Sequence, residues 1–144
     1  MPARADFARG VQAYDGGDYR TAAEEWRLAA EGCDPRAETA LAMLYQDGLG
    51  VPRDIRRAIH WYERAARAGD PVAQMSLGDL YAVGRGTALD RVRAYVWLDL
   101  AAGSGKDWAA RRRDGIERKM TVRELHRAKE AIRAFRPMSP ASCQ

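Results

Sequence analysis

The sequence predicts an all-α protein, a right-handed α-solenoid of about three helix-turn-helix repeats followed by a C-terminal capping helix pair. Three observations lead to this prediction. The chain resembles itself at a spacing of 36 residues, its apolar residues follow helical spacing within each repeat, and helix-capping residues recur at matching places. Self-similarity at a period of roughly 20 to 50 residues is the sequence signature of a repeat architecture.

The repeat is clearest when residues 37–72 are aligned with residues 73–108, because 13 of the 36 positions are then identical. The shared residues are of structural rather than catalytic types. In the first of these units, Leu41, Leu44 and Tyr45 have the spacing of an apolar stripe on one helix. The stripe of a second helix consists of Ile55, Ala58, Ile59, Tyr62, Ala65 and Ala66.

Capping residues indicate where these helices begin and end. The dipeptides Asp34-Pro35 and Asp70-Pro71 each place a capping carboxylate before a proline, which starts a first helix. Gly48 and its neighbour Gly50 allow the positive φ angles of a sharp connection between the two helices. The second helices are then expected to begin after Asp54 and Asp90.

Residues 7–36 contain a shorter version of the same unit. Ala22, Trp26, Ala29 and Ala30 continue the second-helix pattern, but the sequence "YDGGDY" replaces the longer glycine loop. The spacing of glycine, alanine, tyrosine and tryptophan in this stretch resembles a tetratricopeptide repeat of about 34 residues. The first unit is therefore expected to be a hybrid of two repeat types.

The pattern A-x-x-x-L-A/G-x-L-Y-x-x-G-x-G-V/T-x-x-D-x-x-x-A-x-x-W, followed by A-A-x-x-G, resembles the Sel1-like repeat, which is related to the tetratricopeptide repeat. The resemblance covers residues 7–105. The remainder is similar to the closing segment of many bacterial Sel1-repeat proteins. It implies one more helix, a Met-Thr turn and a last amphipathic helix.

Within that remainder, Thr121 and Glu124 form a capping box. Arg113 stands where Leu41 and Leu77 stand in the repeats, so the last unit either slips in register or leaves that face exposed to water. The apolar face expected to seal the stack is formed by Leu125, Ala128, Ile132 and Phe135. The predicted organisation is one domain over residues 1–137, with units at about 5–36, 37–72 and 73–108, a cap at 109–137 and a disordered tail at 138–144.

Composition limits the class of protein. A chain of 144 residues, 31% of them charged, has the length of one ordinary domain and contains no apolar stretch long enough to cross a bilayer. The start of the chain lacks the apolar segment of a secretory signal, so we expect a cytoplasmic protein, or a periplasmic or secreted one if a signal peptide has been removed. We expect it to be monomeric.

Cys33 and Cys143 are the only cysteines, and one of them lies in a tail rich in proline and serine. We therefore expect free thiols rather than a disulfide framework. Cys33 stands at the end of a second helix, where the two later repeats have Gly69 and Gly105. This position favours a structural or incidental thiol over a nucleophile.

The sequence contains no recognisable catalytic or metal-binding pattern. His60 and His126 are the only histidines, and neither has a carboxylate or cysteine at ligand spacing. The glycine-rich stretches lack the Lys-Ser/Thr pair of a phosphate-binding loop and recur at the repeat period. We expect no catalytic residue, no metal and no cofactor, and a hydrolase is the least favoured function.

Basic residues are concentrated near the end of the chain, where residues 106–136 contain 11 Lys or Arg against five Asp or Glu. Their plain interpretation is a solvated helix face. The alternative function is binding of a nucleic acid or another acidic ligand, motivated by Arg111, Arg112, Arg113, Arg118 and Lys119. Only Trp108 places an aromatic side chain among these basic residues, so we do not expect a nucleic-acid partner.

The favoured function is a non-enzymatic adaptor or scaffold that binds a protein or peptide partner in the concave groove of the solenoid. The resemblance implies that the first helix of each unit lines this groove. A position in the core, rather than in the groove, is the alternative for Phe7, Met43 and Met75. The predicted partner-binding residues are Phe7, Val11, Tyr14, Thr39, Met43, Gln46, Asp47, Met75, Asp79, Ala82, Val83, Trp108, Arg111, Arg118 and Lys119.

Overall fold

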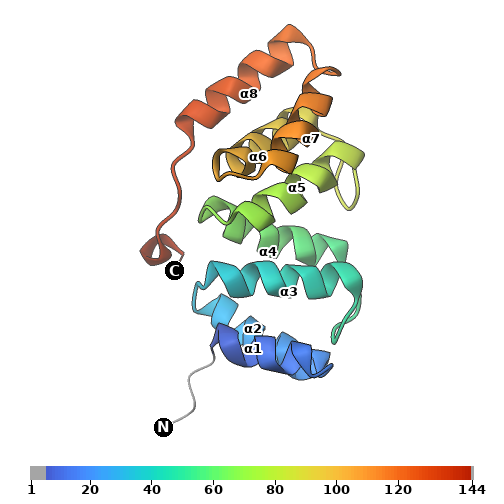
Figure 1. The fold of residues 1–144 in the computed structure, drawn as a ribbon, viewed down its shortest axis with the longest axis vertical. Helices are drawn as coiled ribbons and strands as arrows, with labels where there is room; N and C mark the ends of the chain where they lie inside the picture. The colour runs from blue at the N-terminus through green and yellow to red at the C-terminus, as the bar shows by residue number, and fades with distance from the viewer. Residues whose placement is uncertain (1–5, 144) are drawn as a thin grey trace.

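A computed structural model of the protein describes residues 6–143. Residues 1–5 and 144, which include the start of the predicted domain and the last residue of the predicted tail, lie outside the described residues. The structure consists of eight α-helices and one short 3-10 helix, with no strand among the described residues (Figure 1). The α-helices are α1 (Phe7–Asp15), α2 (Tyr19–Glu31), α3 (Pro35–Asp47), α4 (Ile55–Arg67), α5 (Pro71–Val83), α6 (Arg91–Gly103), α7 (Asp107–Glu117) and α8 (Val122–Ala134).

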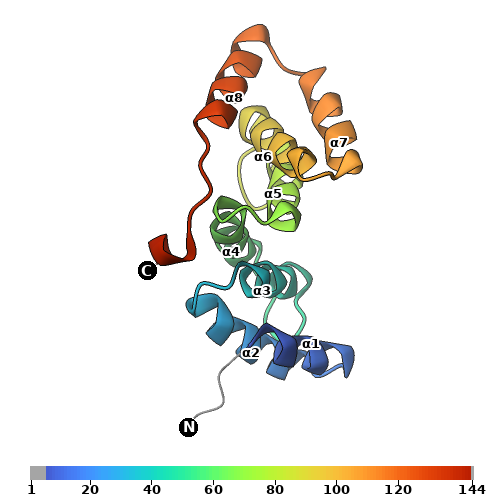
Figure 2. The ribbon, with the colours of Figure 1, turned by 60° about the vertical axis from the view of Figure 1, so that its left-hand side comes forward.

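The helices stack in sequence order. Helix α1 packs on α2, α3 on α4 and α5 on α6, and the successive pairs are joined by contacts between α2 and α3, α4 and α5, and α6 and α7. Helix α6 also contacts α8, so it lies between α7 and α8 (Figure 2). The predicted all-α solenoid is confirmed. None of the helices in residues 6–143 combines the length and the apolar character that crossing a membrane requires.

Successive repeats begin and end alike because their capping residues recur. The side chains of Asp34 and Asp70 accept hydrogen bonds from backbone N–H groups in the first turns of α3 and α5, and each helix has proline in its first turn. Both helices end at a glycine in the left-handed conformation, Gly48 with φ 70° and Gly84 with φ 69°. The predicted helix starts and glycine connections are confirmed.

The connection between the two helices of a repeat is closed by backbone hydrogen bonds. The N–H of Asp54 donates to the carbonyl oxygen of Tyr45 at 2.8 Å, and one repeat later the N–H of Asp90 donates to that of Tyr81 at 2.9 Å. The two aspartate side chains then cap α4 and α6. The connecting loop is therefore a structural element that recurs in both repeats.

The core is built from small side chains at helix contacts and larger ones between them. Ala58, Ala65 and Ala66 are fully buried, and Tyr62 and Leu77 are almost fully buried beside them. Trp61 and Trp97 are partly buried and pack against this core. Small residues let helix axes approach closely, which explains why alanine recurs along the stack.

The first unit packs through an aromatic side chain over a glycine. A Cβ atom at Gly10 of α1 would overlap the ring of Trp26 in α2. The indole N–H of Trp26 donates to the carbonyl oxygen of Phe7 at 3.1 Å, and the rings of Phe7 and Trp26 are stacked with their centroids 6.0 Å apart. These contacts hold the two helices of the shorter first unit together.

Helix α8 closes the far end of the stack on α6. The expected capping box is present, since the N–H of Glu124 donates to the Thr121 hydroxyl and the Glu124 carboxylate accepts from the Thr121 N–H. The ring of Phe135 meets that of Trp97 edge to face at 6.0 Å. Arg113 is the seventh residue of α7, as Leu41 is of α3 and Leu77 of α5, so the register does not slip. Its guanidinium donates to the carboxylate of Asp99 on α6 at 2.7 Å.

The prediction of free thiols was wrong, because Cys33 and Cys143 form a disulfide with their Cα atoms 6.0 Å apart. The physical reason lies in the path of the tail. After α8 the chain runs back along the stack toward the level of α3 and α4, as both views show (Figures 1 and 2). Residues 138–143, expected to be disordered, include the short helix Pro140–Ser142 and bring Cys143 to the end of α2.

Candidate functional site

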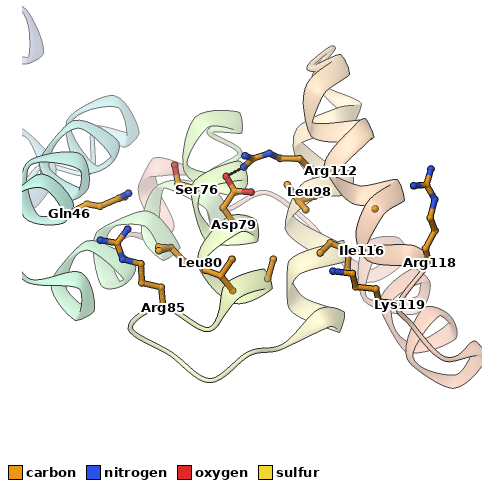
Figure 3. A pocket seen from close by; sticks show the side chains of 13 residues that line it. Gln46, Ser76, Asp79, Leu80, Arg85, Leu98, Arg112, Ile116, Arg118 and Lys119 are labelled. Atoms are coloured by element: carbon orange, nitrogen blue, oxygen red, sulfur yellow. Dashed lines mark hydrogen bonds and ion pairs between the residues drawn. The ribbon is translucent and has the colours of Figure 1, made fainter.

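The first helices of the repeats line a cavity on one side of the stack. Helices α3, α5 and α7 meet there around a space of about 680 Å³, and α6 contributes to its floor (Figure 3). The lining residues are Gln46, Ser76, Asp79, Leu80, Ala82, Val83, Arg85, Leu98, Arg112, Gly115, Ile116, Arg118 and Lys119. We call this space the groove cavity.

The floor of the groove cavity is apolar. Leu80 and Leu98 are buried, Ile116 is partly buried, and Val83 is 69% exposed at the end of α5. An exposed valine beside buried leucines offers apolar area that the protein itself does not cover. A partner side chain that covers this area would gain stabilisation of roughly 25 cal/mol for each Å² of apolar surface removed from water.

Basic side chains surround this floor. Arg118 and Lys119 follow the end of α7, Arg85 lies in the loop between α5 and α6, and Arg112 projects from α7 (Figure 3). Asp79 supplies the only carboxylate among the lining residues, against four basic groups. The cavity therefore favours acidic ligands electrostatically.

Asp79 is not free to balance that positive charge. Its carboxylate forms an ion pair with the guanidinium of Arg112, which joins α5 to α7 across the cavity. Burial raises the pKa of Asp79, and the neighbouring Arg112 opposes this shift. With Arg112 engaged by Asp79, the basic groups left for a ligand are Arg85, Arg118 and Lys119.

A hydrogen bond to a buried phenol holds one polar side chain of the cavity in place. The hydroxyl of Tyr62 in α4 donates to the Gln46 side-chain oxygen in α3 at 2.8 Å. Burial raises the pKa of Tyr62 to about 12, so this phenol stays protonated and remains a donor at neutral pH. Gln46 is thereby held in one orientation that faces the cavity.

The structure brings only part of the predicted set to the groove cavity. Gln46, Asp79, Ala82, Val83, Arg118 and Lys119 line it. Tyr14 and Met43 are 39% and 46% exposed on α1 and α3, outside the cavity, and Trp108 is 44% exposed at the start of α7. Asp47 and Arg111 are also exposed, and Met75 is partly buried.

Three residues of the predicted set serve the packing of the stack. Thr39 is buried, and its hydroxyl donates to the Asp70 carboxylate at 2.9 Å, which ties α3 to the start of α5. Phe7 and Val11 are partly buried and pack against the core. Phe7 thus takes the core position that we considered as its alternative.

Seven lining residues of the groove cavity were not among the predicted groove residues: Ser76, Leu80, Arg85, Leu98, Arg112, Gly115 and Ile116. Arg85 lies in a loop where the preceding repeat has Leu49, so a rule restricted to first helices omits it. Leu98 belongs to a second helix and reaches the cavity because Gly78 faces it in α5. Ile116 was missed because Arg113 obscured the apolar pattern of α7.

No group of three or more His, Cys, Asp or Glu side chains that could hold a metal ion occurs in residues 6–143. His60 and His126 lie on α4 and α8, and both are exposed. His126 is 3.2 Å from the carboxylate of Glu130, one helical turn further along α8, so the expectation that no carboxylate stands at such a spacing from this histidine was wrong.

The Sel1 repeat pattern matches residues 35–70 and 71–106, which together make up half of the chain. The chain belongs to the Sel1 repeat family. The matched repeats each begin at the proline that follows the capping aspartate, so they correspond to α3 with α4 and α5 with α6. Sel1 repeats typically form protein-interaction scaffolds and are generally not catalytic.

Two solved structures of similar proteins agree with this assignment. A protective antigen of uropathogenic Escherichia coli strains that displays an SLR fold is 26% identical, with a TM-score of 0.83 over 93% of this chain. A Sel1 repeat protein from Oxalobacter formigenes is 30% identical, with a TM-score of 0.68 over 74% of this chain. This Sel1 repeat chain spans only 30% and 42% of those two proteins. No curated protein matches the sequence.

Proposed function

We propose that this Sel1 repeat chain is a non-enzymatic adaptor that binds a segment of a partner protein in the groove cavity between α3, α5 and α7. The observation that carries the proposal is the combination of an uncovered apolar floor with basic groups at its edge that form no ion pair within residues 6–143. Val83 is the most exposed apolar residue of that floor, and Arg118 and Lys119 line the same cavity.

The cavity suits a ligand with an apolar side chain followed by acidic residues. The apolar side chain would cover Val83 and Ile116, and carboxylates would reach the cations at the end of α7. Exposed Tyr14 and Met43 extend the apolar character of the first helices toward the other end of the stack. Apolar anchors of this kind control dissociation, whereas complementary charge mainly raises the association rate.

Ion pairs in the structure favour a protein partner over a nucleic acid. Two of the five basic residues that motivated the nucleic-acid alternative are already paired: Arg112 with Asp79, and Arg113 with Asp99 and Asp114. Fewer cations therefore remain for phosphates. An acidic peptide needs only one or two cations beside an apolar contact, and the groove cavity provides that combination.

A peptide-display selection tests the proposal without a known partner. A random peptide library is selected on the wild-type protein, on the double variant Arg118→Glu with Lys119→Glu, and on a matched control, Arg123→Glu with Lys129→Glu on α8. All four residues are exposed, and the two double variants change the net charge equally.

We expect wild type and the α8 control to enrich the same peptides, with Asp or Glu close to a large apolar residue. The α7 double variant should lose that acidic preference. Enrichment of peptides without acidic residues by the wild type, or loss of the preference in the α8 control as well, would contradict the proposed binding site.

A further inference from the structure

The C-terminal segment of residues 137–143, here called the strap, fastens the cap of the solenoid to its first unit. The N–H of Met138 donates to the carbonyl oxygen of Arg67 at the end of α4, at 2.7 Å. Further on, Cys143 is bonded to Cys33, from which it is separated by 110 residues in the sequence. The disulfide thus closes α3 to α8 into one covalent ring.

One arginine contacts both sulfur atoms of this bond. The Nη2 atom of Arg64 lies 2.8 Å from the Cys143 sulfur and 3.9 Å from the Cys33 sulfur. Its Nε donates to the Glu38 carboxylate at 3.0 Å, and its guanidinium stacks 5.0 Å from the ring centroid of Trp61. These contacts hold the Arg64 guanidinium against the disulfide.

The disulfide is also open to small molecules. A cavity of about 210 Å³ lies between the strap and helices α3 and α4, and both cysteines line it. The charged groups that face it are Glu38, Arg64 and Arg67. Cys143 is partly exposed, whereas Cys33 is buried, so the Cys143 sulfur is the more accessible of the two.

From these contacts we infer that the Cys33–Cys143 disulfide is reducible, and that a dithiol reductant breaks it and so releases the strap. We call this disulfide the clasp. A thiolate of the reductant attacks the more exposed Cys143 sulfur, and the Cys33 sulfur leaves as a thiolate whose distance from the Arg64 guanidinium is 3.9 Å in the closed state. The second thiol of the reductant then displaces Cys143, and the reductant becomes a disulfide. Two electrons pass to the protein, and the two protons of the reductant end on the two cysteine sulfurs.

Arg64 acts as a positioning residue in this exchange, because a neighbouring cation stabilises the thiolate that leaves. A leaving thiolate that is more stable departs faster. Disulfides persist in oxidising compartments and are opened in the reducing cytosol. The clasp would therefore be closed outside the cytoplasm, which is the periplasmic or secreted alternative to the cytoplasmic location expected from the sequence, and open where dithiol reductants are abundant.

The test is reduction of the full chain by dithiothreitol. Thiol alkylation with mass spectrometry counts the free cysteines, and hydrogen exchange measures the protection of backbone amides in the strap. Before reduction we expect no alkylation. After reduction, the Met138 amide should exchange on the order of tenfold faster or more, since the strap is released. Cys143→Ser should show the fast exchange without any reductant.

The variant Arg64→Gln isolates the role of the cation, with Arg67→Gln as the matched control, since Arg67 lines the same cavity without a contact to either sulfur. We expect Arg64→Gln to slow reduction about threefold and Arg67→Gln to leave it unchanged. Equal slowing by both variants would overturn the role of Arg64. Two results with the wild-type protein alone would overturn the proposal that the disulfide is a reducible clasp. One is alkylation of both cysteines before reduction, and the other is equal exchange of the Met138 amide in the oxidised and reduced states.

Discussion

Cys33 and Gly69 occupy the same place in successive repeats and have the same left-handed backbone, with φ 67° and 97°. The N–H of each donates to an alanine carbonyl three residues earlier, at 3.0 Å in both cases. Within the described chain, Cys33 is the only residue other than glycine with a positive φ. A side chain in this conformation costs roughly 1–2 kcal/mol, so the disulfide holds Cys33 where the repeat favours glycine.

This relationship predicts an unusual effect of replacing the cysteine. In a Cys143→Ser background, where no disulfide forms, Cys33→Gly should be more stable than Cys33→Ala by about 1 kcal/mol, because glycine adopts positive φ without strain. Guanidinium unfolding monitored by circular dichroism measures the difference. A Cys33→Ala protein as stable as Cys33→Gly would show that the repeat does not require the left-handed conformation at this position.

The disulfide itself should contribute measurably to stability. It closes a loop of more than 100 residues, and such a bond typically contributes about 2–4 kcal/mol. The oxidised wild type should therefore unfold at higher guanidinium concentration than the double variant Cys33→Ser with Cys143→Ser. Wild type measured with excess reductant is the control and should match the double variant. Equal midpoints for oxidised and reduced wild type would contradict the prediction.

The glycines that end α3 and α5 should not accept a β-branched residue. A Cβ at Gly84 would lie 2.9 Å from the backbone nitrogen of Leu89, and Gly48 shares the same left-handed conformation. Gly84→Val and Gly48→Val should each lower the free energy of unfolding by more than about 1 kcal/mol. Gly103→Ala in α6, where a Cβ meets nothing within 4 Å, is the control and should cost nothing. Unchanged thermal midpoints for both valine variants would show that these two helix ends do not require glycine.

Glu38 makes stability depend on pH in a defined direction. It is almost fully buried, and burial raises its pKa even though Arg64 opposes the shift. The folded state therefore holds a proton on Glu38 at pH values where the unfolded state has lost it. Between the unfolded pKa and the raised folded pKa, ionisation of Glu38 lowers stability as the pH increases.

Comparison with Glu38→Gln isolates this effect, because the amide keeps the shape and does not titrate. The usual pKa of this carboxyl group is 4.5, and the folded-state pKa is higher. As the pH is raised from below 4.5 through the folded-state pKa, the difference in unfolding free energy, wild type minus Glu38→Gln, should decrease. Urea unfolding at a series of pH values measures the difference. A difference that increases with pH would mean that Arg64 outweighs burial.

The repeated parts of the fold were predictable from the sequence, and the long-range connections were not. Gly48 and Gly84 stand 36 residues apart in matching contexts, so the repeat spacing alone was enough to infer their loops. The environment of Arg113 could not be inferred in this way, because its pairing with Asp99 depends on how α7 packs against α6. The spacing of residues along the chain predicts helices and loops well, but it does not predict how the helices pack against one another.

The disulfide illustrates the same limit. The strap is short and rich in proline and serine, and no periodic pattern indicates that it runs back along the stack to α2. One signal was present in the sequence, since a cysteine stands where two other repeats have glycine, and a residue kept in a position that suits glycine calls for a compensating interaction. Among the groove residues, first-helix positions such as Gln46, Asp79 and Val83 could be predicted, but Arg85 in a loop and Leu98 in a second helix needed the three-dimensional arrangement.

Site-specific photo-crosslinking in the source cell tests the central claim, the binding of a partner protein in the groove cavity, most directly. Benzoylphenylalanine is placed at Val83, which is exposed in the cavity, or at His60, which is exposed on α4 outside it. We predict a discrete crosslinked protein from position 83 that is lost when Arg118→Glu and Lys119→Glu are added, and none from position 60. The same crosslinked protein from position 60, with none from position 83, would contradict the account.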